Sequence, residues 1–367
     1  MQQTGRKPFI DNDRMFVEVQ AYTGKYAVQD PDFFRCVAAE QSGKMESSWK
    51  YRPINAEIEI TNKCNQHCPH CGMASNGMNG ISYSSQELKT IAASLYRNGI
   101  TSVSITGGEP FIEFDRMTDF ISACKGKVDI CKITTNGFWG DRAGQYFQRL
   151  EKAGLFCNRY FVPCLMISVG EQTTPIEDSC AILHYVIENY TPKEITLCIS
   201  SMSEFGGVSK TGRLIEIYQA LYGDFPENRV FLTENYYRNA EKMENAAKPV
   251  TGRKVVDYMH SPVKCFEHMI GRYVHPRMLI KADGQVQTCA CFNPPKELIV
   301  GNVKEMELHE ILERINQNVF VSIIAENGLQ QFSRYLPESL YSDLFCENEC
   351  DACRILISLY KAQNGMD

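Results

Sequence analysis

Three cysteines near residue 64 have a spacing that suits a metal centre. The segment CNQHCPHC occupies residues 64–71 and follows the pattern C-x3-C-x2-C. Three thiolates in one short loop can bind a soft metal centre. A four-iron cluster with only three cysteine ligands keeps one iron open for another ligand. A structural zinc site is the alternative, and it would need a fourth ligand such as His67 or His70.

The C-terminal part of the chain contains a second group of cysteines. A loop cysteine, a cysteine next to an expected hairpin and a distant pair could together bind one iron–sulfur cluster. Zinc held by four cysteines is the alternative at this site as well. The six cysteines of the group are Cys265, Cys289, Cys291, Cys346, Cys350 and Cys353.

Composition limits what these thiols can do. The 16 cysteines among 367 residues are too sparse for a small disulfide scaffold. The N-terminus lacks the apolar segment of a secretory signal, so we expect a cytoplasmic, reducing location and metal binding or catalysis. No apolar run reaches the roughly 18 residues of a membrane span, so we expect no membrane partner. The net charge of −6 argues against a nucleic-acid partner.

The elements that must position the first cysteines alternate regularly between strand and helix. Helix 84–97 has apolar residues on one face and a capping box formed by Ser84 and Glu87. The spacing of the strands is that of βα units, which predicts a partial barrel, with a doubly wound open sheet as the alternative. The expected strands are 56–60, 102–105, 130–135, 166–169, 194–200 and 229–233, and the expected helices 84–97, 115–124, 142–153, 176–189 and 212–222.

Beyond these units the pattern changes. Asp283-Gly284, between two short alternating runs, predicts a hairpin. Helices are expected over residues 307–315 and 352–361. We therefore expect four parts: an N-terminal segment 1–52 of unassigned fold, a barrel over 53–240, a linker over 241–263, and a small α+β cluster-binding extension over 264–367.

Two motifs together resemble the radical S-adenosylmethionine (SAM) enzymes. The cysteine loop matches the family's C-x3-C-x-φ-C signature, with His70 at the aromatic position φ. Residues 107–110 (GGEP) follow the second expected strand and match the element that binds the amino group of the SAM methionine. The resemblance implies a partial (β/α)6 TIM-like barrel. It implies cluster ligands at Cys64, Cys68 and Cys71, and SAM contacts at His70, Gly107, Gly108, Glu109, Pro110, Asn136 and Ser168.

The resemblance also implies a mechanism. In the family, the open iron of a [4Fe-4S] cluster chelates SAM, and an electron from the reduced cluster cleaves SAM to a 5′-deoxyadenosyl radical. The radical then abstracts a hydrogen atom from the substrate. A reducing partner such as flavodoxin or ferredoxin would supply the electron.

The C-terminal region resembles the SPASM and twitch extensions of this family, which hold auxiliary clusters. A full SPASM extension has seven cysteines, and this region has six, so the shorter twitch form with one auxiliary [4Fe-4S] cluster fits better. The expected ligands are Cys265, Cys289, Cys350 and Cys353, with Cys346 in reserve.

The resemblance leaves the substrate open. Relatives with such extensions mostly modify ribosomally made peptides, so we expect a peptide cross-link or epimerisation. A dehydrogenase or epimerase of an aminoglycoside, a sugar or another small molecule is the alternative, and an inactive iron–sulfur or zinc protein is a third. A thiol that returns a hydrogen atom to the substrate would be Cys291, Cys198 or Cys164.

Overall fold

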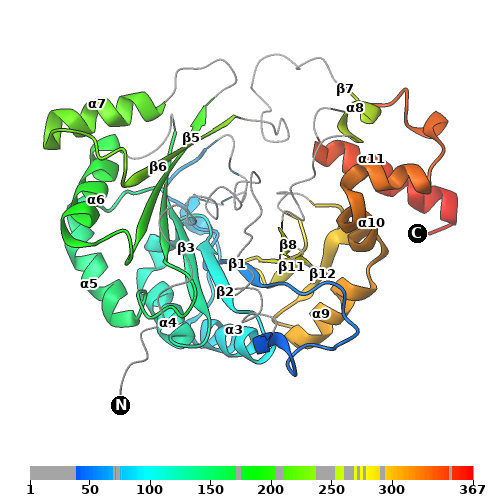
Figure 1. Cartoon of the computed structure of the whole chain (residues 1–367), viewed down its shortest axis with the longest axis horizontal. Helices are drawn as coiled ribbons and strands as arrows, with labels where there is room; N and C mark the ends of the chain where they lie inside the picture. The colour runs from blue at the N-terminus through cyan, green and yellow to red at the C-terminus, as the bar shows by residue number, and fades with distance from the viewer. Residues whose placement is uncertain are drawn as a thin grey trace.

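The computed structural model places a curved sheet of parallel strands beside a smaller C-terminal extension (Figure 1). It describes residues 39–68, 71, 75, 77–170, 175–203, 210–236, 253–259, 268–270, 273–275, 278–289, 294–346 and 349–366. Within this part of the chain, no helix combines the length and the apolar character needed to cross a membrane.

Six parallel strands form the barrel part of the sheet. They are β1 (Asn55–Glu59), β2 (Ser102–Thr106), β3 (Asp129–Thr135), β4 (Cys164–Val169), β5 (Thr196–Ser203) and β6 (Val230–Tyr236). Their order in the sheet is their order in the chain, and every neighbouring pair is parallel. A doubly wound sheet would reverse its strand order at a switch point. The partial barrel predicted from the sequence is therefore confirmed.

Helices cover the outer side of this sheet (Figure 1). They are α3 (Ser85–Arg97), α4 (Phe114–Cys124), α5 (Ala143–Ala153), α6 (Ile176–Asn189) and α7 (Lys210–Tyr222). The capping box at the start of α3 is confirmed, because Ser84 and Glu87 exchange hydrogen bonds there. Alternate strand residues such as Ile58 and Ile105 share one apolar core with buried helix residues such as Leu88.

The opposite face of the strands is more polar. Ser104 lies in register with Lys132, and Lys132 lies in register with Cys164. Cys164, Met166, Cys198 and Phe231 form a small cluster of their own, separate from the main core. The inside of the barrel is therefore lined by hydroxyls, thiols and a cation rather than by aliphatic side chains alone.

Three strands of the extension continue the barrel sheet. Strand β10 (Met278–Ile280) pairs in parallel with β1, and β11 (Gln285–Gln287) and β12 (Ile299–Asn302) follow it in antiparallel pairing. The predicted hairpin is confirmed, with Gly284 at φ +95° in its turn. This pairing covers the edge of β1, which would otherwise be open.

The remaining described elements complete the extension. They are β8 (His268–Ile270), β9 (Tyr273–His275), α9 (Leu308–Gln317), α10 (Val319–Asn327), β13 (Phe345–Cys346) and α11 (Glu349–Asn364). Helix α10 was not expected, because its apolar run is too short to show a helical period. Its N-cap Asn318 accepts hydrogen bonds from the backbone of Phe320 and Val321.

Part of the stretch 241–263, expected to be a linker, is ordered. Strand β7 (Arg253–Lys254) pairs with β13, and α8 (Val255–Met259) follows it and buries Val255 and Met259. The polar composition of this stretch hid the short element, whose partner strand lies almost a hundred residues further along the chain. The segment from residue 39 onward is also anchored, because Asn316 of α9 bonds both the backbone N–H and C=O of Tyr51 at 2.8 and 2.9 Å.

Candidate functional site

The first cysteine loop leaves the carboxyl end of β1 and is held by backbone hydrogen bonds. Cys64 N–H donates to Gly77 C=O at 2.9 Å, and Cys71 N–H donates to Cys68 C=O at 3.1 Å. Asn62 Oδ1 accepts from the backbone N–H of Ile81. The returning segment after the loop therefore closes it at its base, and all three cysteines lie at the end of the barrel where parallel-strand folds keep their sites.

The glycine pair after β2 packs directly against this loop. Gly108 N–H donates to Thr61 C=O at 2.7 Å, and Glu109 N–H donates to Lys63 C=O at 2.8 Å. A Cβ at Gly107 would come within 2.3 Å of Thr61 O, and a Cβ at Gly108 within 2.0 Å of Lys63 O. Glycine is therefore required here because two stretches of protein backbone touch.

Glu109 is fully buried, and its carboxylate binds the chain itself. Oε1 accepts hydrogen bonds from Phe111 N–H at 3.0 Å and Thr135 Oγ1 at 2.9 Å. Oε2 accepts from Asn136 N–H at 2.6 Å. Burial raises the pKa of Glu109 to about 7, and these hydrogen bonds oppose the rise. In this arrangement the carboxylate braces the ends of β2 and β3 against each other, while its contact with an ammonium group stays a prediction.

Asn136 connects the end of β3 to the cysteine loop. Its Nδ2 donates to Asn65 Oδ1 at 2.7 Å and lies 3.9 Å from Cys64 Sγ. The neighbouring Thr135 hydroxyl accepts hydrogen bonds from Gly137 N–H and from the buried Trp139 Nε1 at 3.1 and 3.0 Å. The cysteine loop, the GGEP turn and the Thr135–Gly137 turn thus form one hydrogen-bonded unit.

The three sulfurs have distinct surroundings. Burial raises the pKa of the Cys64 thiol to about 11, and the charges of Glu109, Cys71 and Cys68 add to the rise. Cys68 Sγ lies 3.5 Å from Gln66 Oε1, and Cys71 Sγ lies 3.4 Å from Ser75 Oγ. Among the described residues, no three His, Cys, Asp or Glu side chains are gathered in a metal-binding arrangement. The thiols here make hydrogen bonds that a bound metal would have to replace.

The remaining residues predicted to contact SAM or the substrate lie outside this hydrogen-bonded unit. Ser168 is half-buried at the end of β4, in register with Ser200 of β5. Cys164 and Cys198 lie on the inner face of the barrel and are both buried. His70 and Cys291 lie outside the described residues.

The C-terminal cysteines are only partly described. Cys289, Cys346 and Cys353 are not disulfide-bonded; the first two are buried, and Cys353 on α11 is half-buried. Cys350, one turn earlier on the same helix, is disulfide-bonded. Burial, with negative charges at Asp351, Asp257 and Glu349, raises the pKa of Cys346 to about 11. Cys265 lies outside the described residues, so the expected set of four ligands is not seen as a whole.

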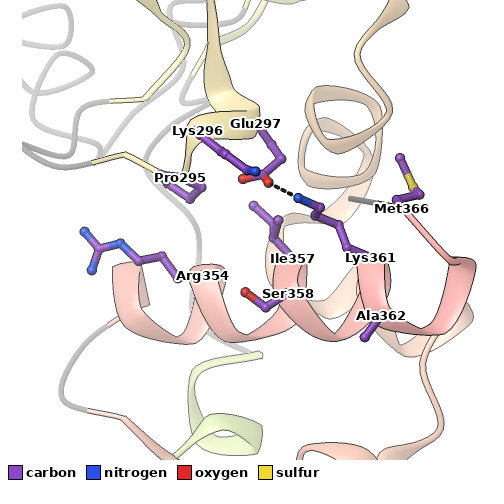
Figure 2. Close-up of a pocket in the computed structure, with 9 residues that line it drawn as sticks. All are labelled: Pro295, Lys296, Glu297, Arg354, Ile357, Ser358, Lys361, Ala362 and Met366. Carbon is purple, nitrogen blue, oxygen red and sulfur yellow. Dashed lines mark hydrogen bonds and ion pairs between the residues drawn. The ribbon is translucent and has the colours of Figure 1, made fainter.

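A cavity of about 470 Å³ on the extension contains none of the predicted site residues. It lies between α11 and the 3-10 turn Lys296–Leu298, and Figure 2 shows Lys361 of α11 reaching toward Glu297. These two side chains form an ion pair of 2.7 Å, which closes one wall. The cavity is lined by Pro295, Lys296, Glu297, Arg354, Ile357, Ser358, Lys361, Ala362 and Met366.

Comparison with known proteins identifies the family. The family model described as Radical SAM superfamily matches residues 58–168, which contain all three parts of the hydrogen-bonded unit. Residues 58–168 form a radical SAM domain. As a radical SAM enzyme, the protein uses a [4Fe-4S] cluster and SAM as cofactors.

Individual relatives of this radical SAM enzyme differ in what they do. The chain is 20% identical to the putative peptide biosynthesis protein YydG of Bacillus subtilis over 289 residues, covering 77% of this chain and 83% of the relative. It is 24% identical to a probable GTP 3′,8-cyclase of Thermococcus kodakarensis, covering 66% and 86%.

Two solved structures are also similar. They are Streptococcus suis SuiB bound to the precursor peptide SuiA (TM-score 0.42, 15% identity, covering 84% of this chain and 77% of SuiB) and BtrN in complex with AdoMet and 2-DOIA (TM-score 0.44, 13% identity, covering 75% and 88%).

The residues of the cysteine loop fit a cluster. Three soft sulfur donors suit iron, and they leave one iron open. Gln66 Nε2, buried inside the loop, has no hydrogen-bond partner among the described residues, so an acceptor is missing there. Sequence reasoning missed Gln66 as well as Thr135 and Asn65. The signal that could have found Gln66 is an amide between two cysteines of a loop expected to be buried.

Proposed function

We propose that this radical SAM enzyme modifies a ribosomally made peptide by hydrogen-atom abstraction, forming a cross-link or inverting a residue. The observation that carries this proposal is the relationship to a putative peptide biosynthesis protein, which extends over 77% of this chain and is therefore longer than the barrel alone. A relative that matched the barrel alone would say nothing of the substrate, because the barrel holds the shared cofactors.

In this proposal Cys64, Cys68 and Cys71 hold the [4Fe-4S] cluster and leave one iron for SAM. Cluster and SAM, when bound, supply a 5′-deoxyadenosyl radical. The chain's own contribution is position, because Glu109 and Asn136 fix the GGEP turn and the cysteine loop relative to each other. Gly107, Gly108 and Pro110 would line the SAM methionine, and Ser168 and His70 would contact other parts of SAM.

The extension, residues 264–367, would hold one auxiliary [4Fe-4S] cluster. Cys289 and Cys353 are not joined in disulfides, which supports this role. Cys265 and Cys350 would complete the set, with Cys346 in reserve. A disulfide-bonded Cys350 cannot bind iron, so reduction of that disulfide must come before cluster assembly.

Return of a hydrogen atom to the substrate would fall to one of three thiols. Cys198 and Cys164 lie on the inner face of the barrel, where both are buried. Cys291 follows a proposed ligand in the chain by two residues. Epimerisation would need such a donor, whereas cross-linking would not.

Anaerobic reconstitution tests the proposal. With SAM and dithionite, the wild-type protein should form 5′-deoxyadenosine, and a precursor peptide should stimulate that turnover and gain a change of mass or retention. Cys68→Ala should form none. Cys157→Ala is the matched control, because Cys157 is an exposed free thiol outside the site, and it should behave as wild type.

The relationship to a GTP 3′,8-cyclase favours a second candidate, a small-molecule substrate. The same assay separates the two when GTP and an aminoglycoside are tested beside peptides. Coupled consumption of GTP or of the aminoglycoside, with no peptide modified, would overturn the peptide proposal and leave the radical SAM activity standing. Absence of 5′-deoxyadenosine under all conditions would favour an inactive cluster-binding protein.

A further inference from the structure

Gln66 lies inside the cysteine loop and contacts two of its sulfurs. Its backbone N–H donates to Cys64 Sγ at 3.4 Å. Its side-chain Oε1 accepts from Cys68 Sγ at 3.5 Å. The residue is only 8% exposed. Gln66 is therefore bonded to the two cysteines through both its backbone and its side chain, and its amide oxygen faces Cys68 Sγ rather than solvent.

The other half of this amide is unsatisfied. Nε2 carries two N–H donors, is enclosed by protein, and has no hydrogen-bond partner among the described residues. A buried polar group left unpaired costs about 1–3 kcal/mol, and such groups are rare in native proteins. An apolar side chain of similar length would avoid this cost. The amide therefore requires an acceptor that the described residues do not supply.

The acceptor that fits is sulfur of a bound cluster. When Cys64 and Cys68 become thiolate ligands, they turn from weak donors into charged acceptors, and cluster sulfides are acceptors too. Hydrogen bonds to a charged partner are about twice as strong as neutral ones. Hydrogen bonds to cluster sulfurs are also among the factors that set the reduction potential.

We propose that Gln66 is a positioning residue that donates its Nε2–H to a sulfur of the [4Fe-4S] cluster held by Cys64, Cys68 and Cys71, and that this bond makes the cluster easier to reduce. The inference rests on the proposed function of those three cysteines. Reduction adds negative charge to the sulfurs, so a donor stabilises the reduced cluster more than the oxidised one. A residue that only braced the loop would not change this balance.

The test is a redox titration of the reconstituted full-length protein. The signal followed by electron paramagnetic resonance is the one that SAM addition changes, which separates this cluster from an auxiliary one. Gln66→Met keeps the length of the side chain and removes the donors. It should lower the ratio of reduced to oxidised cluster at a fixed potential at least tenfold, which corresponds to a midpoint about 59 mV lower for one electron.

Two further variants sharpen the result. Gln66→Glu keeps the shape but replaces the donors with a carboxylate, and it should lower the midpoint at least as far as Gln66→Met. Gln86→Met is the matched control, because Gln86 is exposed on α3, and its midpoint should equal that of wild type. An unchanged midpoint in an iron-loaded Gln66→Met protein would overturn the inference.

A measurement on the wild type covers the case in which Gln66→Met fails to load iron. Protein grown with glutamine labelled with ¹⁵N at the side-chain amide should show a nitrogen coupling to the reduced cluster by pulsed magnetic resonance. Absence of that coupling overturns the inference while the SAM-sensitive signal keeps the proposed function intact. Absence of any SAM-sensitive signal in the wild type overturns both.

Discussion

The loop after β1 and the end of the extension share the cysteine spacing C-x3-C-x2-C, yet the structure uses it in two ways. Cys64, Cys68 and Cys71 lie in an irregular loop that closes on the backbone of two neighbouring turns. The corresponding cysteines of the extension lie on a strand, Cys346, and on one face of helix α11, Cys350 and Cys353. The same spacing therefore places three sulfurs in one loop at the first site. At the second site the cysteines lie on two different elements, and a cluster there would need further cysteine ligands from elsewhere in the chain.

The two groups of cysteines also differ in the residues that contact them. In the barrel, the side chain of Asn136, directly after β3, reaches the cysteine loop and donates to it. In the extension, Cys346 Sγ donates to Arg253 C=O at 3.7 Å, so its contact is with a strand of the two-stranded β7–β13 sheet. The comparison shows that the spacing of cysteines along the chain does not by itself identify a set of metal ligands. The elements and hydrogen bonds that hold the sulfur atoms in place also decide which cysteines can bind one cluster.

The largest expected effect comes from removing one cysteine of each group and measuring iron content and SAM cleavage. Cys71→Ala should remove about four of about eight irons and abolish 5′-deoxyadenosine formation, because no other residue of the loop replaces a thiolate. Cys353→Ala should also lose about four irons but keep SAM cleavage. Iron analysis and chromatography of the products check both.

The opposite pattern would break the comparison. If Cys353→Ala abolished SAM cleavage while Cys71→Ala kept it, the roles assigned to the two groups would be reversed. Cys157→Ala, a change at an exposed thiol, provides the baseline for both measurements.

A buried carboxyl where barrel and extension meet should make stability depend on pH. Glu59 Oε2 accepts from Ala282 N–H at 2.9 Å, and Oε1 has no partner among the described residues. Burial raises the pKa of Glu59 from 4.5 to about 7. The folded state thus holds a proton that the unfolded state releases, so the stabilisation present below about pH 4.5 is lost as pH rises to about 7.

Glu59→Gln removes this titration and is the matched variant. Relative to it, the wild type should lose at most about 3 kcal/mol of unfolding free energy between pH 4.5 and 7. Urea unfolding of both proteins at several pH values measures the difference. Equal slopes against pH would show that Glu59 does not titrate in this range.

The third effect concerns the hydroxyl that supports the barrel site. Thr135→Val leaves the buried Trp139 Nε1 without its acceptor and removes one of the two hydrogen bonds to Glu109 Oε1. The expected cost is about 2 kcal/mol of unfolding free energy, with faster loss of iron from the loop. Thr90→Val, at a hydroxyl on the exposed side of α3, should cost less than about 0.5 kcal/mol. Similar costs for both would mean that the network does not support the site.

The smallest effect is a count of thiols in the extension. In metal-free protein without reductant, Cys350→Ala should show about one more reactive thiol than wild type on unfolding, because the disulfide partner of Cys350 becomes free. A labelling reagent and mass spectrometry give the count. One thiol fewer than wild type would show that Cys350 is a free thiol and available to a cluster at all times.

Much of the barrel follows from local pattern. The periods of 2 and 3.6, the capping box at Ser84 and the Asp283-Gly284 turn each depend on residues close in the chain, so strands, helices and the hairpin could be predicted. The parallel pairing of β10 with β1 could not, because it joins residues more than 200 positions apart. The same reason hid β7, whose partner β13 is distant.

By itself, the sequence determined the chemistry of this protein: three thiols in one loop, a GGEP turn one βα unit later, and hence a radical SAM enzyme. Only the tertiary structure decided how those parts support one another. It placed Gly107 and Gly108 against the backbone of the cysteine loop and buried Glu109 under the end of β3. It also left Gln66 Nε2 with no acceptor among the residues that the structure describes. The physical reason is that hydrogen-bond partners and burial depend on which segments meet in space, and neither is encoded in the spacing of residues along the chain.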